Sequence, residues 1–234
     1  MIEALLWGAV GGAPLFIGAV LTLVRRWPPK LIGIVLGFGA GALMASIAFE
    51  LVEDGLDLAG PFPLVIGIAL GALCYYVADR IIDARAAASS GSSGLPLAVG
   101  ALLDGIPEQL VLGIGLASGE GVSVALVIAI VVSNLPESIG SAAGLRDSGM
   151  KKSRLLWMWG ILAVFCALMT VVGFWVTDAV GADFRAAANG FAAGALLVML
   201  VDSMVPEAQS KAKESTGLAT VLGFAVAAGL SLVA

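Results

Sequence analysis

Two segments of this chain carry carboxylate and amide side chains within otherwise apolar sequence, each with a proline directly before a glutamate. The first segment contains Asp104 and Glu108, and the second contains Ser133, Asn134 and Glu137. Residues four apart lie on one face of a helix, so Asp104 shares a face with Glu108, and Ser133 with Glu137. A proline removes one backbone donor and disturbs the helix around it. The two segments therefore predict a pair of disturbed helices with oxygen-bearing side chains at their centres.

If the two disturbed segments face each other, three carboxylates, one amide and one hydroxyl come together. An ionised carboxylate at the centre of a bilayer costs roughly 2.5–3.5 kcal/mol, so such a group holds either protons or a cation. We predict a divalent metal site, and two other interpretations stay open: a proton path, and protonated carboxyls that only join two helices. The candidate metal ligands are Asp104, Glu108, Ser133, Asn134 and Glu137.

The composition shows what kind of elements must position these side chains. Hydrophobic residues make up 60% of the 234 residues and charged residues only 12%, whereas soluble domains carry roughly 25% charged residues. The apolar runs are near-continuous rather than alternating, which favours membrane helices of about 20 residues over a barrel. We predict an all-α integral membrane protein with eight transmembrane helices, at residues 3–24, 31–51, 61–78, 95–116, 122–144, 155–176, 186–206 and 218–234.

The basic residues predict how these helices cross the membrane. All but one of the 12 Lys and Arg residues lie in alternate loops, at 24–30, 79–94, 145–154 and 207–217; the exception is Arg185. Basic loops stay on the cytoplasmic side. We therefore expect a multi-pass protein of the cell (inner) membrane with both termini extracytoplasmic. The outer side is then mainly acidic, and an acidic surface concentrates cations.

The chain also repeats itself. Residues 37–43 of the second span resemble residues 190–196 of the seventh, and the two proline-glutamate segments resemble each other. In both cases the matched spans run in opposite directions. Inverted repeats with broken helices are typical of secondary transporters. We predict one transmembrane domain over 1–234, with spans 1–3 and 6–8 as inverted repeats around spans 4–5. Its parts are a first three-helix repeat (1–78), a flexible cytoplasmic linker (79–94), a central metal-site helix pair (95–144) and a second three-helix repeat (145–234).

These segments resemble the motifs of the ZIP family of divalent metal transporters. Residues 104–109 and 133–138 resemble the proline-glutamate motifs of its spans 4 and 5, which form a binuclear metal site. Residues 143–149 resemble the bacterial, GufA-like branch, and residues 201–208 resemble the span 7 motif. The resemblance implies eight spans, both termini outside, and transport of a divalent metal such as zinc, manganese or iron.

The sequence departs from the family pattern at its histidines. The first His of the family motif falls on Asp104, and the usual His or Gln of span 5 falls on Ser133; the chain contains no His at all. Oxygen ligands suit Mg, Ca, Mn or Fe(II) better than zinc, although zinc also accepts carboxylates. The substitutions therefore leave the metal open among zinc, manganese and iron.

The acidic residues toward the span ends complete the predicted function. Glu50 closes span 2 on the outer side, and Asp202 and Glu207 lie toward the inner end of span 7, so we assign all three to the transport pathway. We predict a divalent metal transporter with no cofactor beyond the transported metal. The expected partners are the divalent metal and the lipid bilayer, and no nucleic acid is expected. Whether the protein forms a homodimer is left open by the sequence. No nucleophile–base pair points to an enzyme. The alternatives are a proton-coupled carrier of another small cation and a non-transporting, ZIP-like metal-binding or accessory membrane protein.

Overall fold

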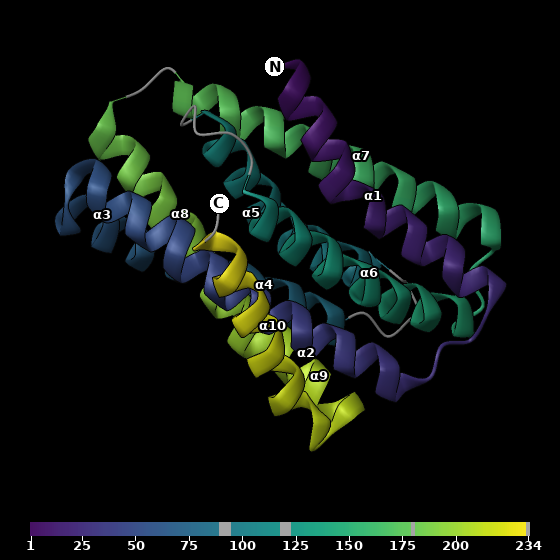
Figure 1. The fold of residues 1–234 in the computed structure, drawn as a ribbon. Helices are drawn as coiled ribbons and strands as arrows, with labels where there is room; N and C mark the ends of the chain where they lie inside the picture. The colour runs from purple at the N-terminus through teal and green to yellow at the C-terminus, as the bar shows by residue number, and fades with distance from the viewer. Residues whose placement is uncertain (89–94, 118–122, 179–180, 233–234) are drawn as a thin grey trace.

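The computed structural model describes residues 1–88, 95–117, 123–178 and 181–232 (Figure 1). These residues form helices joined by short connections, and no strand occurs among them. The elements are α1 (Ile2–Val24), α2 (Pro29–Ser46), η1 (Ile47–Val52), α3 (Glu53–Ala59), α4 (Pro61–Ala88), α5 (Leu95–Ala117), α6 (Val124–Asp147), α7 (Lys152–Asp178), α8 (Ala182–Met199), η2 (Leu200–Met204), α9 (Val205–Ala212) and α10 (Ser215–Ser231).

The helices have the length and composition of membrane spans. In the described part of the chain, seven are long and apolar enough to cross a membrane, and α10 is an eighth, shorter apolar helix of 17 residues. At 1.5 Å per residue, α10 is about 26 Å long, slightly less than the hydrocarbon core of roughly 30 Å. The predicted all-helical architecture is confirmed for the described residues, and its helices have the length and composition needed to span a membrane.

One predicted boundary is wrong. We expected span 3 to end at residue 78 and a flexible linker to follow over 79–94, but α4 continues to Ala88. Residues 79–88 are rich in alanine and arginine, which are good helix formers, and contain neither glycine nor proline. The helix therefore extends past its apolar portion. The rest of the predicted linker, 89–94, lies outside the described residues.

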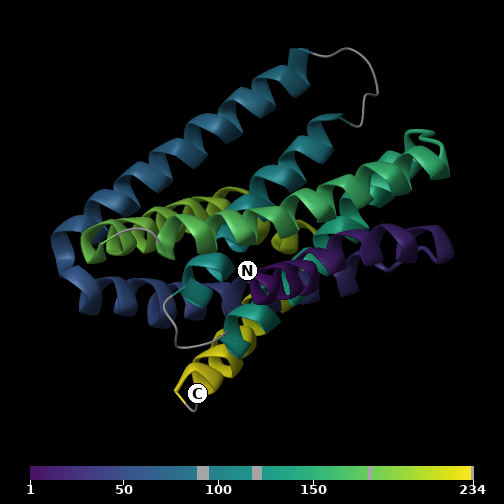
Figure 2. The ribbon, with the colours of Figure 1, turned by 90° about the horizontal axis from the view of Figure 1, so that it is seen from above.

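The helices form two groups. In the first group, α1 packs on α6 and α7, and α5 also packs on α7; in the second, α2 pairs with α10, and α4 with α8. In Figure 1, α1 and α7 lie side by side on one flank, with α5 and α6 between them and the second group. The groups meet where α2 packs on α6 and α8 packs on α5. Figure 2 shows α4 at the edge of the bundle.

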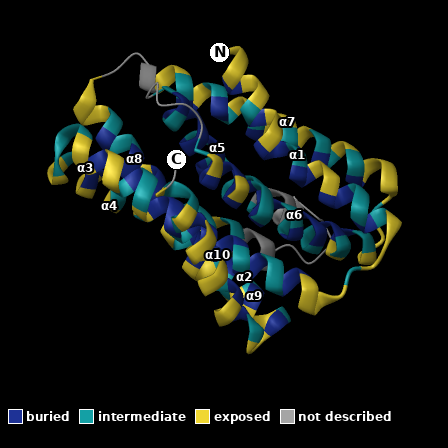
Figure 3. Ribbon diagram, viewed as in Figure 1, coloured by how far each residue is buried: buried dark blue, intermediate teal, exposed yellow. Residues whose placement is uncertain are grey.

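Burial follows these helix interfaces (Figure 3). Small and aliphatic side chains fill the interfaces, whereas large apolar side chains such as Phe62, Trp157 and Leu218 are exposed. A soluble protein rarely exposes so much apolar surface, and lipid is the solvent that such a surface requires. The core is thus made of helix–helix contacts with an apolar exterior.

Glycines let the paired helices approach closely. A Cβ atom added at Gly41 of α2 would lie 1.8 Å from the Thr220 carbonyl oxygen of α10. A Cβ added at Gly71 of α4 would lie 1.9 Å from the Phe191 carbonyl oxygen of α8. Neither position has room for a methyl group, as expected where small residues form membrane helix interfaces.

Two helices contain a π-helical turn in their interior. The α2 helix passes through η1 into α3, and α8 passes through η2 into α9. Glu50 lies in η1, and Asp202 and Ser203 lie in η2. Because π turns widen the helix and occur often at functional sites, they direct attention to these residues.

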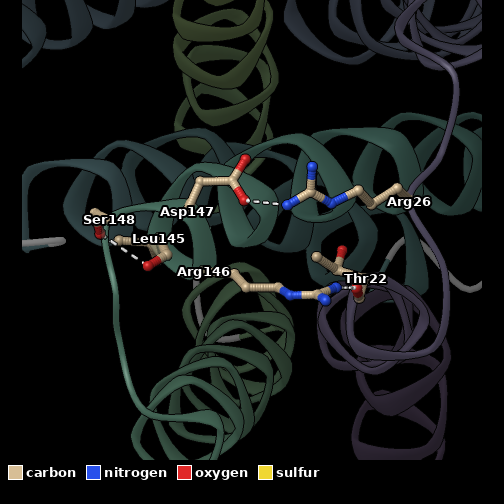
Figure 4. Close-up of polar contacts among 6 residues, drawn as sticks. All are labelled: Thr22, Arg26, Leu145, Arg146, Asp147 and Ser148. Carbon is tan, nitrogen blue, oxygen red and sulfur yellow. Dashed lines mark hydrogen bonds and ion pairs between the residues drawn. The ribbon is translucent and has the colours of Figure 1, made fainter.

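Polar contacts hold one end of α6 against α1 and the connection that follows it (Figure 4). Arg146 Nη1 donates to the Thr22 carbonyl oxygen at 2.5 Å, and Thr22 Oγ1 donates to the Ile139 carbonyl oxygen at 3.2 Å. Arg26 also pairs with Asp147 at 3.3 Å, an exposed pair that contributes little to stability. The contacts of Thr22 fix how α6 lies against α1.

Candidate metal site

The predicted site lies where α5 and α6 carry their internal prolines. We expected breaks at Pro107 and Pro136, but both helices remain continuous through these residues. The interrupted helices are instead α2 and α8, at η1 and η2. A proline in a packed membrane helix is tolerated because neighbouring groups satisfy the freed backbone atoms, so sequence alone overstated the disturbance.

Glu108 is held by a residue of α6. Its Oε1 atom accepts a hydrogen bond from Ser133 Oγ at 3.0 Å, and its Oε2 atom is buried with no hydrogen-bond partner. Glu108 is 1% exposed and Ser133 is fully buried. Glu108 Oε2 is thus a buried carboxyl oxygen at the α5–α6 interface without a hydrogen-bond partner.

Asn134 and Glu137 contribute two further oxygens from α6. Asn134 Nδ2 donates to the Gly11 carbonyl oxygen at 3.2 Å, while Asn134 Oδ1 is buried without a partner. Glu137 Oε1 is likewise buried and unpartnered. The Asn134 amide lies beside Glu108, and the Glu137 carboxyl interacts electrostatically with Glu108.

Asp104 is held by a residue of α4. It accepts a hydrogen bond from the Tyr75 hydroxyl of α4, which also contacts Ser203 of η2. The carboxyls of Asp104 and Glu137 lie within hydrogen-bonding reach of each other. Pairwise contacts thus link Glu108 with Ser133 and Asn134, and Asp104 with Glu137.

The carboxylates do not converge on one point in this structure. Within the described ranges, no group of three or more His, Cys, Asp or Glu side chains could hold a metal ion as the side chains stand. Tyr75 holds Asp104 from α4, whereas Ser133 holds Glu108 from α6. Asp104 and Glu108 are thus anchored to different helices.

The predicted pathway residues have three different environments. Glu50 Oε1 accepts hydrogen bonds from Ser123 Oγ at 2.5 Å and Ser231 Oγ at 3.0 Å, which joins η1 to the start of α6 and the end of α10. Glu207 pairs with Lys211 and interacts electrostatically with Asp104 and Glu137. Asp202 lies in η2 and is exposed, and its neighbour Ser203 is the residue that contacts Tyr75.

Sequence reasoning missed Tyr75 and Gln109. Gln109 is fully buried and accepts a hydrogen bond from Thr170 Oγ1 at 2.5 Å. Its position directly after Glu108 is a signal that could have identified it. Tyr75 lies in an apolar span 29 residues before Asp104, and no local pattern connects the two.

No family model matches the chain, and no curated protein matches it significantly. The resemblance to the ZIP family therefore depends on the motifs at residues 104–109, 133–138, 143–149 and 201–208.

Proposed function

We propose that this protein is a transporter that moves divalent metal cations across the cell membrane through the site between α5 and α6. The observation that carries the proposal is a set of buried oxygen atoms without partners: Glu108 Oε2, Asn134 Oδ1 and Glu137 Oε1. The described residues contain nine buried side-chain nitrogen or oxygen atoms without a partner, and these three are the oxygen atoms among them that lie on α5 and α6. Leaving a buried acceptor unpaired costs about 1–3 kcal/mol. A divalent cation accepts oxygen ligands and would satisfy all three together.

The inverted repeat is part of this proposal, and the helix pairing supports it. The matched segments 37–43 and 190–196 lie on α2 and α8, which pair with α10 and α4. A Cβ atom added at Gly223 of α10 would lie 1.9 Å from the carbonyl oxygen of Phe38 in α2. In the same way, a Cβ atom added at Gly71 of α4 would lie 1.9 Å from the carbonyl oxygen of Phe191 in α8. Phe38 and Phe191 occupy the same place in the two segments. The π turns also begin at equivalent positions, Ile47 and Leu200.

The proposed route runs between the two helix groups. A cation approaches from the acidic outer side near Glu50, binds at α5 and α6, and leaves past Glu207. Asp202 is left out of the route because it is exposed. In this orientation both termini are extracytoplasmic. The oxygen ligands favour Mn or Fe(II), while zinc is also accepted.

Flux into proteoliposomes tests the proposal. The purified protein is reconstituted around a manganese-sensitive dye, and at a Mn²⁺ concentration near the wild-type Kd we expect uptake by the wild type and strongly reduced uptake by Glu108→Gln. Mn²⁺ binding without flux would identify a metal-binding or accessory protein instead. Proton or monovalent flux with neither Mn²⁺ flux nor Mn²⁺ binding would identify a carrier of another small cation.

A further inference from the structure

A lysine lies beside the proposed inner route. Lys211 is one helical turn after Glu207 on α9 and donates a hydrogen bond to Glu207 Oε1. The two side chains are only 23% and 36% exposed. An ordinary i,i+4 pair on an exposed helix face is worth little, but this pair is partly enclosed between α9 and its neighbours.

Two glycines on neighbouring helices fix the position of Lys211. A Cβ added at Gly33 of α2 would lie 2.7 Å from Lys211 Cβ, so α9 packs tightly on α2. A Cβ added at Gly140 of α6 would lie 2.8 Å from Lys211 Nζ and 3.2 Å from Glu207 Oε1. The ammonium group therefore rests against α6 at a position that has no side chain.

This contact is close to the carboxylates of the site. Gly140 is three residues after Glu137, so the two lie on neighbouring positions of one face of α6. Glu207 interacts electrostatically with both Asp104 and Glu137. A cation that leaves these carboxylates toward α9 would meet Glu207 with an ammonium group already bound to it.

We infer that the Lys211 ammonium group, paired with Glu207 at the cytoplasmic end of the proposed route, makes the route selective for divalent over monovalent cations. This inference rests on the proposed function. The attraction to a carboxylate scales with charge, so a divalent ion gains about twice what a monovalent ion gains at Glu207. A tethered group acts at an effective concentration of about millimolar or more. A divalent cation is attracted to the Glu207 carboxylate strongly enough to displace the ammonium group. A monovalent cation carries the same charge as the ammonium group, so its attraction to Glu207 is no stronger than the attraction that the displaced group loses.

The ratio of divalent to monovalent flux tests this role. Mn²⁺ and Tl⁺ uptake are measured in the same proteoliposome system for Lys211→Met, which keeps the side-chain length and removes the charge. We expect the Mn²⁺/Tl⁺ ratio to fall about tenfold, which corresponds to about 1.4 kcal/mol of lost discrimination. Lys211→Arg keeps the charge and should retain most of the ratio. Lys213→Met, which changes the neighbouring exposed lysine, is the matched control and should be unchanged.

Each outcome decides the inference. A wild-type ratio in Lys211→Met, with normal Mn²⁺ flux, overturns the role of Lys211 and leaves the transport function standing. Absence of Mn²⁺ flux in the wild type overturns the proposed function and this inference with it. If Lys211→Met does not fold, Gly140→Ala provides the second variant, because its methyl group would move the ammonium group away from α6. An unchanged ratio in Gly140→Ala also overturns the inference.

Discussion

Replacing Glu108 is the sharpest perturbation of the proposed metal site. This side chain is 1% exposed, has one oxygen bonded to Ser133 and keeps the other without a partner. Glu108→Gln keeps the shape and the Ser133 contact but removes the charge. Glu108→Ala removes both oxygens, so it should be the more damaging of the two changes.

The size of the expected loss follows from the typical strength of contacts to a charged group. A hydrogen bond to a charged group contributes about 1.5–3 kcal/mol, which corresponds to roughly 10–150-fold in a dissociation constant. Loss of an outer-shell partner of a metal ligand already costs about 10–100-fold in affinity. Glu108→Gln should therefore weaken Mn²⁺ binding by about 10–100-fold, and Glu108→Ala by about 100-fold or more.

Calorimetric titration and thermal unfolding with Mn²⁺ measure this loss in two independent ways. At a Mn²⁺ concentration 100 times the wild-type Kd, binding stabilises the wild type by about 2.7 kcal/mol. A variant that binds about 100-fold more weakly is stabilised by only about 0.4 kcal/mol at that concentration. Mn²⁺ should therefore raise the Tm of the wild type clearly and that of Glu108→Ala hardly at all.

The matched control is Glu3→Ala, which makes the same substitution at an exposed position in the first turn of α1. It should keep the wild-type Kd and the full stabilisation by Mn²⁺. If Glu108→Ala also keeps both while remaining folded, Glu108 is not a ligand. The unpartnered oxygens at α5 and α6 would then have another explanation, and the proposed metal site would be rejected.

Three further predictions follow from the same geometry. Asp104→His should raise the ratio of zinc to manganese affinity, because imidazole is the softer ligand; competition titration measures it, and an unchanged ratio would mean that residue 104 does not contact the metal. Mn²⁺ affinity should fall as the pH is lowered from about 7.5 to about 5.5, because carboxylates must lose their protons to bind metal. Glu108→Gln should reduce that pH dependence, and flat affinity across the range in the wild type would exclude proton release on binding. Gly41→Val should lower the free energy of unfolding by about 1–3 kcal/mol or more through overpacking, because its Cβ would lie 1.8 Å from the Thr220 carbonyl oxygen. Gly229→Val, at a position with no atom within 4 Å, is its control, and equal Tm values would contradict the packing argument.

Local sequence signals predicted the helices well and their interruptions poorly. The long apolar runs identified the spans because a membrane helix must satisfy its backbone hydrogen bonds within itself. The π turns at η1 and η2 were not anticipated: no proline lies within or directly after η1, and Pro206, which follows η2, was not taken as the sign of an interruption. Conversely, Pro107 and Pro136 suggested breaks that the packed helices α5 and α6 do not show. The interruption of a helix depends on its neighbours as much as on its own residues.

The sequence by itself determined the all-helical membrane class and the pairing of Asp104 with Glu108 on one face of α5. Both depend on runs or spacings within a single helix. Only the tertiary structure decided that Tyr75 holds Asp104, that Ser133 holds Glu108, and that Lys211 rests against Gly140. These contacts join helices far apart in the chain, and they depend on packing angles and glycine contacts that no local pattern specifies. Membrane helices associate through close packing rather than through a hydrophobic stripe, so the sequence carries little information about which faces meet.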